Sequence, residues 1–320
     1  MPIAIVRSAD EWMAWFGENR KPSAVTIGNF DGVHLGHRKI LRSVLDRAHA
    51  ENLASVVLTF YPHPARVLRP AEAPALLETL DQRLAAIGAL GIDAALVAQF
   101  DAALAQLAPE EFVQRFLVDT MRAKAVLIGG NFRFGHRQSG DARLLADLGR
   151  RCGFDVEIVP PVTADGVVVS STAIRSALRD GKVDEARRML GRPFALAGKI
   201  QSGTGQGRKL VVPTLNLATG QELLPKTGVY ATEAVIDGKI YRAATNIGVR
   251  PTFDGARTTI ESHLFDFNET LISGNLEIRF WSRLRDERKF PGPAELREQV
   301  LRDIDRAKEY FRATASKSSK

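Results

Sequence analysis

The sequence predicts an α/β protein in two parts: a Rossmann-like doubly wound parallel sheet, then a small antiparallel β-barrel with a C-terminal helix. In the first half, continuous apolar runs alternate with helical patterns, which is typical of βαβ units and of a parallel sheet covered on both faces. After about residue 190, strand-like runs follow one another with Gly or Pro turns between them, which is typical of a small barrel. The length of 320 residues allows about two domains.

The first half alternates expected strands with expected helices. The expected helix at 37–50 has apolar residues three and four positions apart, as Leu41, Val44 and Leu45 show. The expected strands are 24–28, 55–60, 94–100, 125–129 and 156–159, and the expected helices are 37–50, 79–90, 109–121 and 141–152. Ligands bind at the carboxyl ends of parallel strands, so the strand-to-helix loops are the expected binding segments.

The second half begins after Gly191-Arg192-Pro193, which interrupts the helical pattern. The pair Asp237-Gly238 between two apolar runs is a strong hairpin signal. The expected strands are 194–201, 228–236, 239–247, 258–265 and 276–284, followed by a helix at 293–311. The polar residues 314–320 are expected to be disordered, so we expect domains at 1–188 and 189–313.

The charge, the cysteine content and the apolar stretches limit the classes to which the protein can belong. The net charge of +7 lies wholly in residues 181–320, because residues 1–180 hold 20 basic and 20 acidic residues. Such a surplus is weak support for nucleic-acid binding and fits a pocket for phosphorylated small molecules equally well. The single cysteine, Cys152, excludes a disulfide within the chain and a Cys-rich metal site. The first ten residues lack the charged and apolar regions of a signal peptide, and the most apolar stretch, 94–108, is too short to span a bilayer, so we expect a cytoplasmic protein without membrane contact.

The segment from Gly28 to His37 follows the first expected strand and opens a helix. His34 and His37 are three residues apart and share a helix face, and Gly36 between them leaves room for a ligand. A helix N-terminus binds phosphate, and two imidazoles beside it can stabilise charge on a phosphoryl group. A solvated or capping histidine pair is the alternative. A zinc site is not expected, because no third ligand lies nearby at metal spacing.

A second group of polar residues lies in the expected barrel. Thr214 and Asn216 are two residues apart, so on a strand they point to the same side. Their hydroxyl and amide oxygens suit Mg²⁺ held by nucleotide phosphates, although ordinary polar strand positions explain them equally well. The glycine-rich segment 198–208 lacks the Walker A spacing and, taken alone, reads as a flexible hairpin. Glu261 is a single carboxylate within a strand pattern, for which a surface position is the default.

The first segment, Gly28-x-Phe30-Asp31-Gly32-x-His34-x-Gly36-His37, resembles the signature of the HxGH nucleotidylyltransferase superfamily. Its Phe-Asp-Gly form resembles the FMN adenylyltransferase module of bacterial bifunctional riboflavin kinase/FAD synthetases. Two later segments, 128–135 and Ser-Ser-Thr-Ala-Ile-Arg at 170–175, resemble the flavin-side loop and the phosphate segment of that module. The resemblance implies ATP and phosphate contacts at Gly28, Phe30, Asp31, Gly36, Ser170, Ser171 and Thr172, catalytic roles for His34, His37 and Arg175, and flavin contacts at Asn131 and Phe132. Helix capping alone would explain the serines and Thr172 equally well.

Most of residues 190–310 resembles the riboflavin kinase module, whose Pro-Thr-Ala-Asn motif appears here as Pro-Thr-Leu-Asn at 213–216. The resemblance implies Mg²⁺ at Thr214 and Asn216, Glu261 as general base, ATP contacts at Gly198, Lys199, Gly203 and Gly207, and a flavin contact at Arg285. The sequence departs from the family pattern beside the expected nucleotide pocket. Leu215 replaces the usual Ala, and Val211 and Val212 stand where Gly and an aromatic residue are commoner.

The resemblance therefore implies an enzyme with two activities. The expected kinase domain would phosphorylate riboflavin with ATP to FMN, and the expected adenylyltransferase domain would convert FMN and ATP to FAD and pyrophosphate. Small molecules are the expected partners, and no nucleic acid is expected. One alternative is a nucleotidyltransferase for another small phosphate with an accessory barrel. Another is a nucleic-acid-binding barrel, which would need exposed aromatic residues along its strands.

Overall fold

The computed structural model describes residues 3–17, 21–201, 214–252, 255–267, 271 and 273–318. Four residues named above, Gly203, Gly207, Val211 and Val212, lie outside these ranges. The chain divides into two compact units, Met1–Ser171 and Thr172–Lys320. Each unit is described by itself below.

The first unit is built on a six-stranded sheet with the strand order β1-β4-β3-β2-β5-β8. All of its strand pairs are parallel, which confirms the predicted sheet. The strands are β1 (Ala4–Val6), β2 (Ser23–Ile27), β3 (Ala54–Tyr61), β4 (Ala94–Gln99), β5 (Ala123–Gly129) and β8 (Asp155–Val159). The three-residue strand β1 was not predicted, because so short a run gives no periodic signal.

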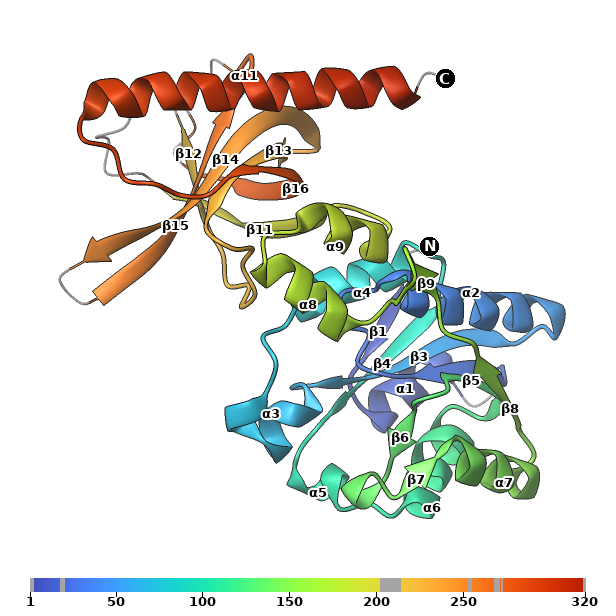
Figure 1. Ribbon diagram of the computed structural model, residues 1–320. Coiled ribbons are helices and arrows are strands. Elements are labelled where there is room, and N and C mark those ends of the chain that lie inside the picture. The colour runs from blue at the N-terminus through green and yellow to red at the C-terminus, as the bar shows by residue number, and fades with distance from the viewer. Residues whose placement is uncertain are drawn as a thin grey trace. The chain divides into compact units, whose positions relative to one another are not determined.

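Helices cover both faces of this sheet (Figure 1), as expected for a doubly wound fold. Apolar residues of α2 and α4, among them Leu41 and Leu84, share one core with one face of the strands. Residues of α1, α7 and the segment after Pro109, among them Trp12 and Leu145, form the core on the other face. The helices are α1 (Ala9–Phe16), α2 (Leu35–Ala50), α3 (Pro64–Leu68), α4 (Leu80–Gly88), α5 (Ala102–Ala105), α6 (Pro109–Phe112) and α7 (Ala142–Cys152).

The helix expected at 109–121 is not regular. After α6 the chain continues as a π-helix, Val113–Thr120, and the Met121 N–H donates to the Phe116 carbonyl five residues earlier, at 3.1 Å. The wider turn keeps Val113, Phe116 and Leu117 in the core. Two short antiparallel pairs complete the unit: β6 (Arg133–Phe134) with β7 (Gly140–Asp141), and β9 (Thr163–Ala164) with β10 (Val167–Val168).

The second unit contains a closed barrel with the strand order β11-β12-β15-β14-β13-β16, and all of its pairs are antiparallel, as predicted. The strands are β11 (Phe194–Gln201), β12 (Leu215–Ala218), β13 (Gly228–Ile236), β14 (Lys239–Thr252), β15 (Gly255–Leu264) and β16 (Asn275–Arg285). Every second residue of β13 points inward, so Tyr230, Thr232 and Ala234 are fully buried. The Thr232 hydroxyl lies 2.6 Å from the Thr245 hydroxyl, which lies 2.7 Å from that of Ser262.

Two helices precede the barrel, α8 (Ser171–Arg179) and α9 (Val183–Leu190). From Thr172 on, both belong to the barrel unit, since α9 packs against β11 and β16. The Arg187 guanidinium lies 5.3 Å from the centre of the Trp281 ring. The compact units therefore divide after Ser171, while the boundary of the two functional domains after residue 188 stays a prediction.

The last helix, α11 (Pro293–Ser318), lies along the outside of the barrel (Figure 1). Ile304, Ala307 and Phe311 pack against Ala231 and Ala244 of the barrel. The expectation that 314–320 lacks regular structure is wrong for residues 314–318, which continue the helix. Alanines there favour helix, and the Thr314 hydroxyl donates to the Tyr310 carbonyl at 2.8 Å.

Candidate active sites

The first site lies where the strand order of the parallel sheet reverses. The chain leaves β2 on one side through β3 and β4 and later returns to its other side as β5. The loops after β2 and β5 therefore open at the same edge, where open α/β sheets bind their ligands. The loop after β2 carries His34 and His37, and the loop after β5 carries Asn131 and Phe132. The structure thus brings two of the sequence motifs to one edge.

The two histidines form a stacked pair at the start of α2. Their ring centres are 3.6 Å apart and the rings are inclined by 16°. His34 is the N-cap of α2, and its Nδ1 accepts a hydrogen bond from the His37 backbone N–H at 3.2 Å. Because Nδ1 is an acceptor, the proton of a neutral His34 ring lies on Nε2. Gly36 makes the stacking possible, since a Cβ at this position would lie 3.1 Å from His34 Cε1.

The turn before α2 is held in an unusual backbone conformation. Phe30 has a φ of 50° and Val33 a φ of 37°, in the left-handed region that non-glycine residues rarely adopt. Each such residue costs about 1–3 kcal/mol, so the surroundings must hold it in place. Both side chains are buried, at 2% and 0% exposure. The loop is therefore fixed in shape before any substrate binds.

Asp31 ties this loop to the segment before α4. Its carboxylate is 2% exposed and accepts the backbone N–H of Leu77 at 3.0 and 3.1 Å and that of Glu78 at 3.3 Å. The Ser171 hydroxyl donates to the Asp31 carbonyl at 2.9 Å, which joins the phosphate segment to the histidine loop. These bonds of the Asp31 carboxylate attach the loop after β2 to the backbone at Leu77 and Glu78.

Sequence reasoning missed Arg83, on α4 below the same loop. This arginine is only 1% exposed, and its Nε and Nη1 have no hydrogen-bond partner among the described residues. Burial lowers the pKa of Arg83, while the nearby carboxylates of Asp31 and Glu78 act in the opposite direction. Burial, His34 and Arg83 in turn hold the pKa of His37 well below its usual range. His37 is therefore a neutral imidazole at neutral pH.

The other residues expected in this site lie as follows. Asn131 is exposed, and Phe132 stacks on Phe134 with ring centres 5.5 Å apart. Ser170 is half-buried and Thr172 is exposed. Arg175 is 7% exposed on α8 and belongs to the second unit, so its link to the histidines comes from the motif alone. Gly28 follows β2, and a Cβ on this residue would lie 3.2 Å from Phe30 Cε2.

The second site is a cavity of about 300 Å³ in the barrel unit. Alternate residues of two neighbouring strands point into it, Ala244, Asn246 and Gly248 from β14 and Thr259, Glu261 and His263 from β15. The remaining wall comes from Thr214, Val229, Val249, Arg285, Glu287, Arg288, Phe290, Leu296, Val300, Asp303 and Ile304. The cavity therefore combines a carboxylate on a strand with an apolar wall from α11.

Glu261 lies at the centre of a polar row across three strands. It is opposite Asn216 of β12 on one side and opposite Asn246 of β14 on the other. Thr214, two residues before Asn216, lines the cavity. The structure therefore brings the expected base and the expected metal ligands together. No group of three or more His, Cys, Asp or Glu residues is arranged for a metal in the described part of the chain.

The other expected kinase residues are placed differently. Gly198 packs against β12, where a Cβ would lie 1.9 Å from the Ala218 carbonyl oxygen, and Lys199 Nζ lies 2.6 Å from Asn275 Oδ1. Neither is among the described residues that line the cavity. Arg285 does line it, and binds Asp303 of α11 through Nε and Nη2 at 2.7–3.0 Å.

Sequence reasoning also missed most of the cavity wall. His263 could have been found from its i+2 spacing to Glu261 on one strand. Asp303, Val300 and Ile304 could not, because an amphipathic helix gives no sign of which strand it covers. Glu287 closes over β14, where its Oε1 accepts the Val249 N–H at 3.3 Å.

A doubly wound sheet with a stacked histidine pair at its switch point defines the class of HxGH nucleotidylyltransferases. Here it is joined in one chain to a closed barrel with its own carboxylate-bearing cavity. Comparison with known families agrees for both parts. Residues 17–173 match the FAD synthetase family model, and residues 190–311 match the riboflavin kinase model.

Curated relatives match nearly the whole chain. A protein of Escherichia coli K12 is 36% identical over 91% of this chain and 93% of its own length. A protein of Pseudomonas fluorescens is 39% identical over 88% of this chain and 91% of its own. Both are named bifunctional riboflavin kinase/FMN adenylyltransferase. The chain belongs to this family: its N-terminal part is an FMN adenylyltransferase (FAD synthetase), and its C-terminal part is a riboflavin kinase.

A solved structure shares the fold. A crystal structure described as a macrolide-efflux protein from Streptococcus pneumoniae superposes with a TM-score of 0.84 and 28% sequence identity, over 96% of this chain and 99% of that chain. Among the described residues here, no helix has both the length and the apolar composition needed to cross a membrane.

Proposed function

We propose that FAD forms at the histidine loop of α2. An FMN phosphate oxygen attacks the α-phosphorus of ATP, the bond to the β-phosphate breaks, and pyrophosphate leaves. His34 Nε2–H and the free N–H groups at the start of α2 stabilise the charge that develops on the α-phosphate. The observation that supports this most is the stacked histidine pair, fixed by the His34 Nδ1 cap and by the rigid turn before it. No covalent intermediate is needed, because alignment and charge stabilisation suffice.

The neighbouring residues of this proposed site bind the two substrates. Ser170, Ser171, Thr172 and Arg175 contact ATP phosphates, and Asn131 and Phe132 contact the flavin. Phe30, Asp31 and Gly36 act by shaping the loop. The burial of Phe30 and Asp31 and the close approach of Gly36 to His34 support this role. We assign this activity to residues 1–188 and the kinase activity to residues 189–313.

FMN formation is proposed to take place in the barrel cavity. Glu261 accepts the proton of the riboflavin 5′-hydroxyl as its oxygen attacks the γ-phosphorus of ATP, and ADP leaves. Arg285 forms part of the flavin wall, and Gly198, Lys199, Gly203 and Gly207 bind the nucleotide. The position of Glu261 between Asn216 and Asn246 in the cavity wall supports this assignment.

A magnesium ion is proposed for the kinase reaction. Thr214 and Asn216 offer neutral oxygens beside Glu261, and the described residues hold no larger cluster of metal-ligating side chains. This donor set fits Mg²⁺ bound mainly through the nucleotide's own phosphates. When bound, the ion neutralises charge on those phosphates.

Crossed substitutions test both assignments in the full chain. With FMN supplied, His34→Ala should lower the rate of FAD formation about 10²–10³-fold, because a donor to the transition state is lost. With riboflavin supplied, Glu261→Gln should lower the rate of FMN formation about 10²–10⁴-fold through loss of the base. Each variant should keep the other activity. Products are separated by chromatography as riboflavin, FMN and FAD, and a parallel loss of both activities in either variant would contradict two separate sites.

A further inference from the structure

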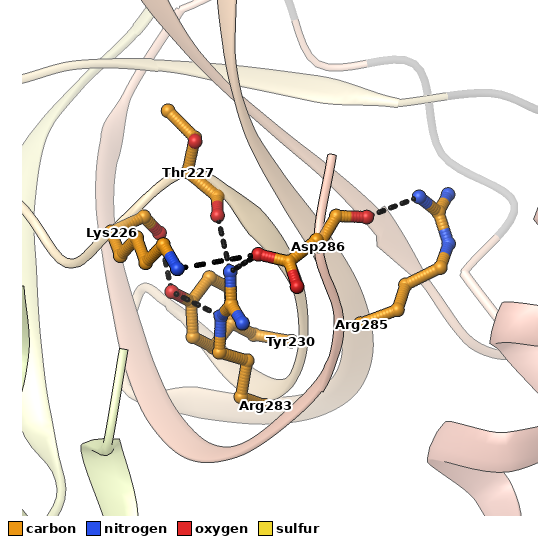
Figure 2. Close-up of polar contacts among 6 residues, drawn as sticks. All are labelled: Lys226, Thr227, Tyr230, Arg283, Arg285 and Asp286. Carbon is orange, nitrogen blue, oxygen red and sulfur yellow. Dashed lines mark hydrogen bonds and ion pairs between the residues drawn. The ribbon is translucent and has the colours of Figure 1, made fainter. Parts of the chain in front are cut away.

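Arg283, on the last barrel strand, has no role in the reaction proposed above, yet it is held by an unusually dense set of contacts. Its Nη2 donates to the Thr227 carbonyl at 2.7 Å and to Asp286 Oδ1 at 2.8 Å. Its Nε donates to the Tyr230 hydroxyl at 3.3 Å, and its guanidinium lies 5.9 Å from the centre of the Tyr230 ring. Figure 2 shows these partners converging on the one guanidinium.

The surroundings of Arg283 are shaped to admit its side chain. Gly181, in the turn between α8 and α9, has a φ of +78°, and a Cβ there would lie 2.6 Å from Arg283 Nε. Tyr230 is fully buried and donates its hydroxyl proton to the Lys226 carbonyl. The Arg283 side chain itself is 19% exposed. The guanidinium is therefore enclosed between a helix turn and the barrel interior, and is not a solvated surface charge.

The contacts continue from Arg283 to the wall of the kinase cavity. The Asp286 carboxylate forms ion pairs with Arg283 Nη2 and, at 3.4 Å, with Lys226 Nζ. Its carbonyl accepts from Arg285 Nη1 at 2.9 Å, as Figure 2 shows. Hydrogen bonding to Arg283 and the charge of Arg283 and Lys226 lower the pKa of Asp286, so it stays ionised. Arg285 lines the cavity together with Phe290 and Asp303.

We propose that Arg283 is a positioning residue of the riboflavin kinase site, which fixes the segment after β16 through Asp286 and thereby holds Arg285 and Phe290 in the cavity wall. The Asp286 side chain is 72% exposed, and its carboxylate is held by the two cations Arg283 and Lys226, which fix the start of the segment. The Arg285–Asp303 bonds orient the Arg285 head group, while the Arg283–Asp286 bonds fix the backbone that carries it. The inference rests on the proposed assignment of Arg285 to the flavin wall.

The direct test is the Arg283→Met variant of the full chain, assayed for FMN formation over a range of riboflavin concentrations. Loss of hydrogen bonds to a charged group should raise KM for riboflavin about tenfold. The kcat for FMN formation should change less than about twofold, because Glu261 is untouched. Arg283→Lys keeps a cation near Asp286 and should recover part of the loss. No recovery by lysine would contradict the role given to the ion pair.

Arg279 provides a matched control on the same strand. Its Nε binds Glu277 at 2.6 Å, and it is not among the described residues that line the cavity. Arg279→Met should leave KM for riboflavin unchanged. Asp286→Asn, at an exposed position where misfolding is not expected, should raise KM in the same direction as Arg283→Met. An unchanged KM in both Arg283→Met and Asp286→Asn, or an equal rise in Arg279→Met, would overturn the proposal.

FAD formation from supplied FMN separates the role proposed for Arg283 from the assignment of the kinase site to the barrel cavity. It should stay within about twofold of the wild-type rate in Arg283→Met. A parallel fall of both activities would show general destabilisation and would overturn the positioning role. If Glu261→Gln left FMN formation intact, the proposed kinase site itself would fail, which is an outcome distinct from any result with Arg283.

Discussion

His37 has a buried Nδ1 without a hydrogen-bond partner among the described residues, and it lies against a second imidazole. Two positive charges on stacked rings 3.6 Å apart would repel each other strongly. The buried Arg83 beside the pair adds to the same effect, since it lowers the pKa of His37 after burial and His34. His37 is therefore held in its neutral form.

This arrangement predicts how FAD formation depends on pH in an Arg83→Met variant. Burial is the largest cause of the low pKa of His37, followed by His34 and then Arg83, so removing the Arg83 cation should raise this pKa. Neutral His37 is the form present at neutral pH, and we take it as the active form. Its protonation would then begin at a higher pH, and the acidic limb of the pH profile should move upward. The rate of FAD formation from FMN, measured across pH, checks this.

Arg83→Lys is the matched control, because it keeps the positive charge and should keep the wild-type profile. FMN formation by the same variants should show no change of profile. An Arg83→Met variant with a rate lowered by the same factor at every pH would indicate a purely structural role and contradict the electrostatic one.

At the scale of elements, the strands and helices whose apolar residues recur at regular spacing were predictable from the sequence. The strands β11 and β13 have the expected bounds, because apolar alternation and Gly turns mark both ends. The four-residue strand β12 was placed only through its motif, and the π-helix after α6 has the same apolar spacing as a regular helix. Local patterns thus determine which elements form, but not their irregularities.

The candidate sites were predictable where a motif carries them and not where tertiary packing does. His34 and His37 stand in a segment with distinctive spacing, and Thr214 and Glu261 were expected through the family resemblance. Arg83 does not, since an arginine on an amphipathic helix normally lies on the solvent side. Arg83 is buried because the loop after β2 packs on α4, and this packing arises only in the folded protein.

The start of α2 yields a prediction that separates helix stability from site geometry. Gly36→Ala replaces glycine by the best helix former, a gain of about 1 kcal/mol in a helix. The added Cβ would lie 3.1 Å from His34 Cε1 and 3.2 Å from Nδ1, so the stacked ring must move. The shift needed is a few tenths of an ångström, less than the misplacement of about 1 Å that costs about 10²-fold in rate, so we expect a loss of up to about tenfold.

We therefore expect Gly36→Ala to lower the rate of FAD formation by up to about tenfold, with an unchanged or slightly raised melting temperature. Gly220→Ala is the control, since nothing lies within 4 Å of the added Cβ. A variant at Gly36 that keeps its FAD-forming rate would show that the stacking of the two rings is dispensable.

At the scale of the whole molecule, the chemistry and the packing divide the chain at different places. The phosphate segment continues into α8, which from Thr172 on belongs to the barrel unit. The Lys226 N–H donates to the Leu178 carbonyl near the end of α8, at 3.0 Å, and α9 packs on β11 and β16. Arg175 is thus carried by a helix whose support includes the kinase barrel.

A fragment of residues 1–188 should therefore form FAD poorly, although the adenylyltransferase motifs are all present in it. Val183 and Ala186 of α9 are fully buried in the complete chain and would lose their barrel partners. Exposing an apolar side chain costs about 1.5–3 kcal/mol, enough to unfold a short helix pair. We expect kcat/KM for FMN to fall about tenfold or more, since each factor of ten needs only about 1.4 kcal/mol. The control is the full chain with Glu261→Gln, which lacks the proposed kinase base but keeps the barrel; equal FAD formation by this variant and the fragment would show that α8 needs no barrel.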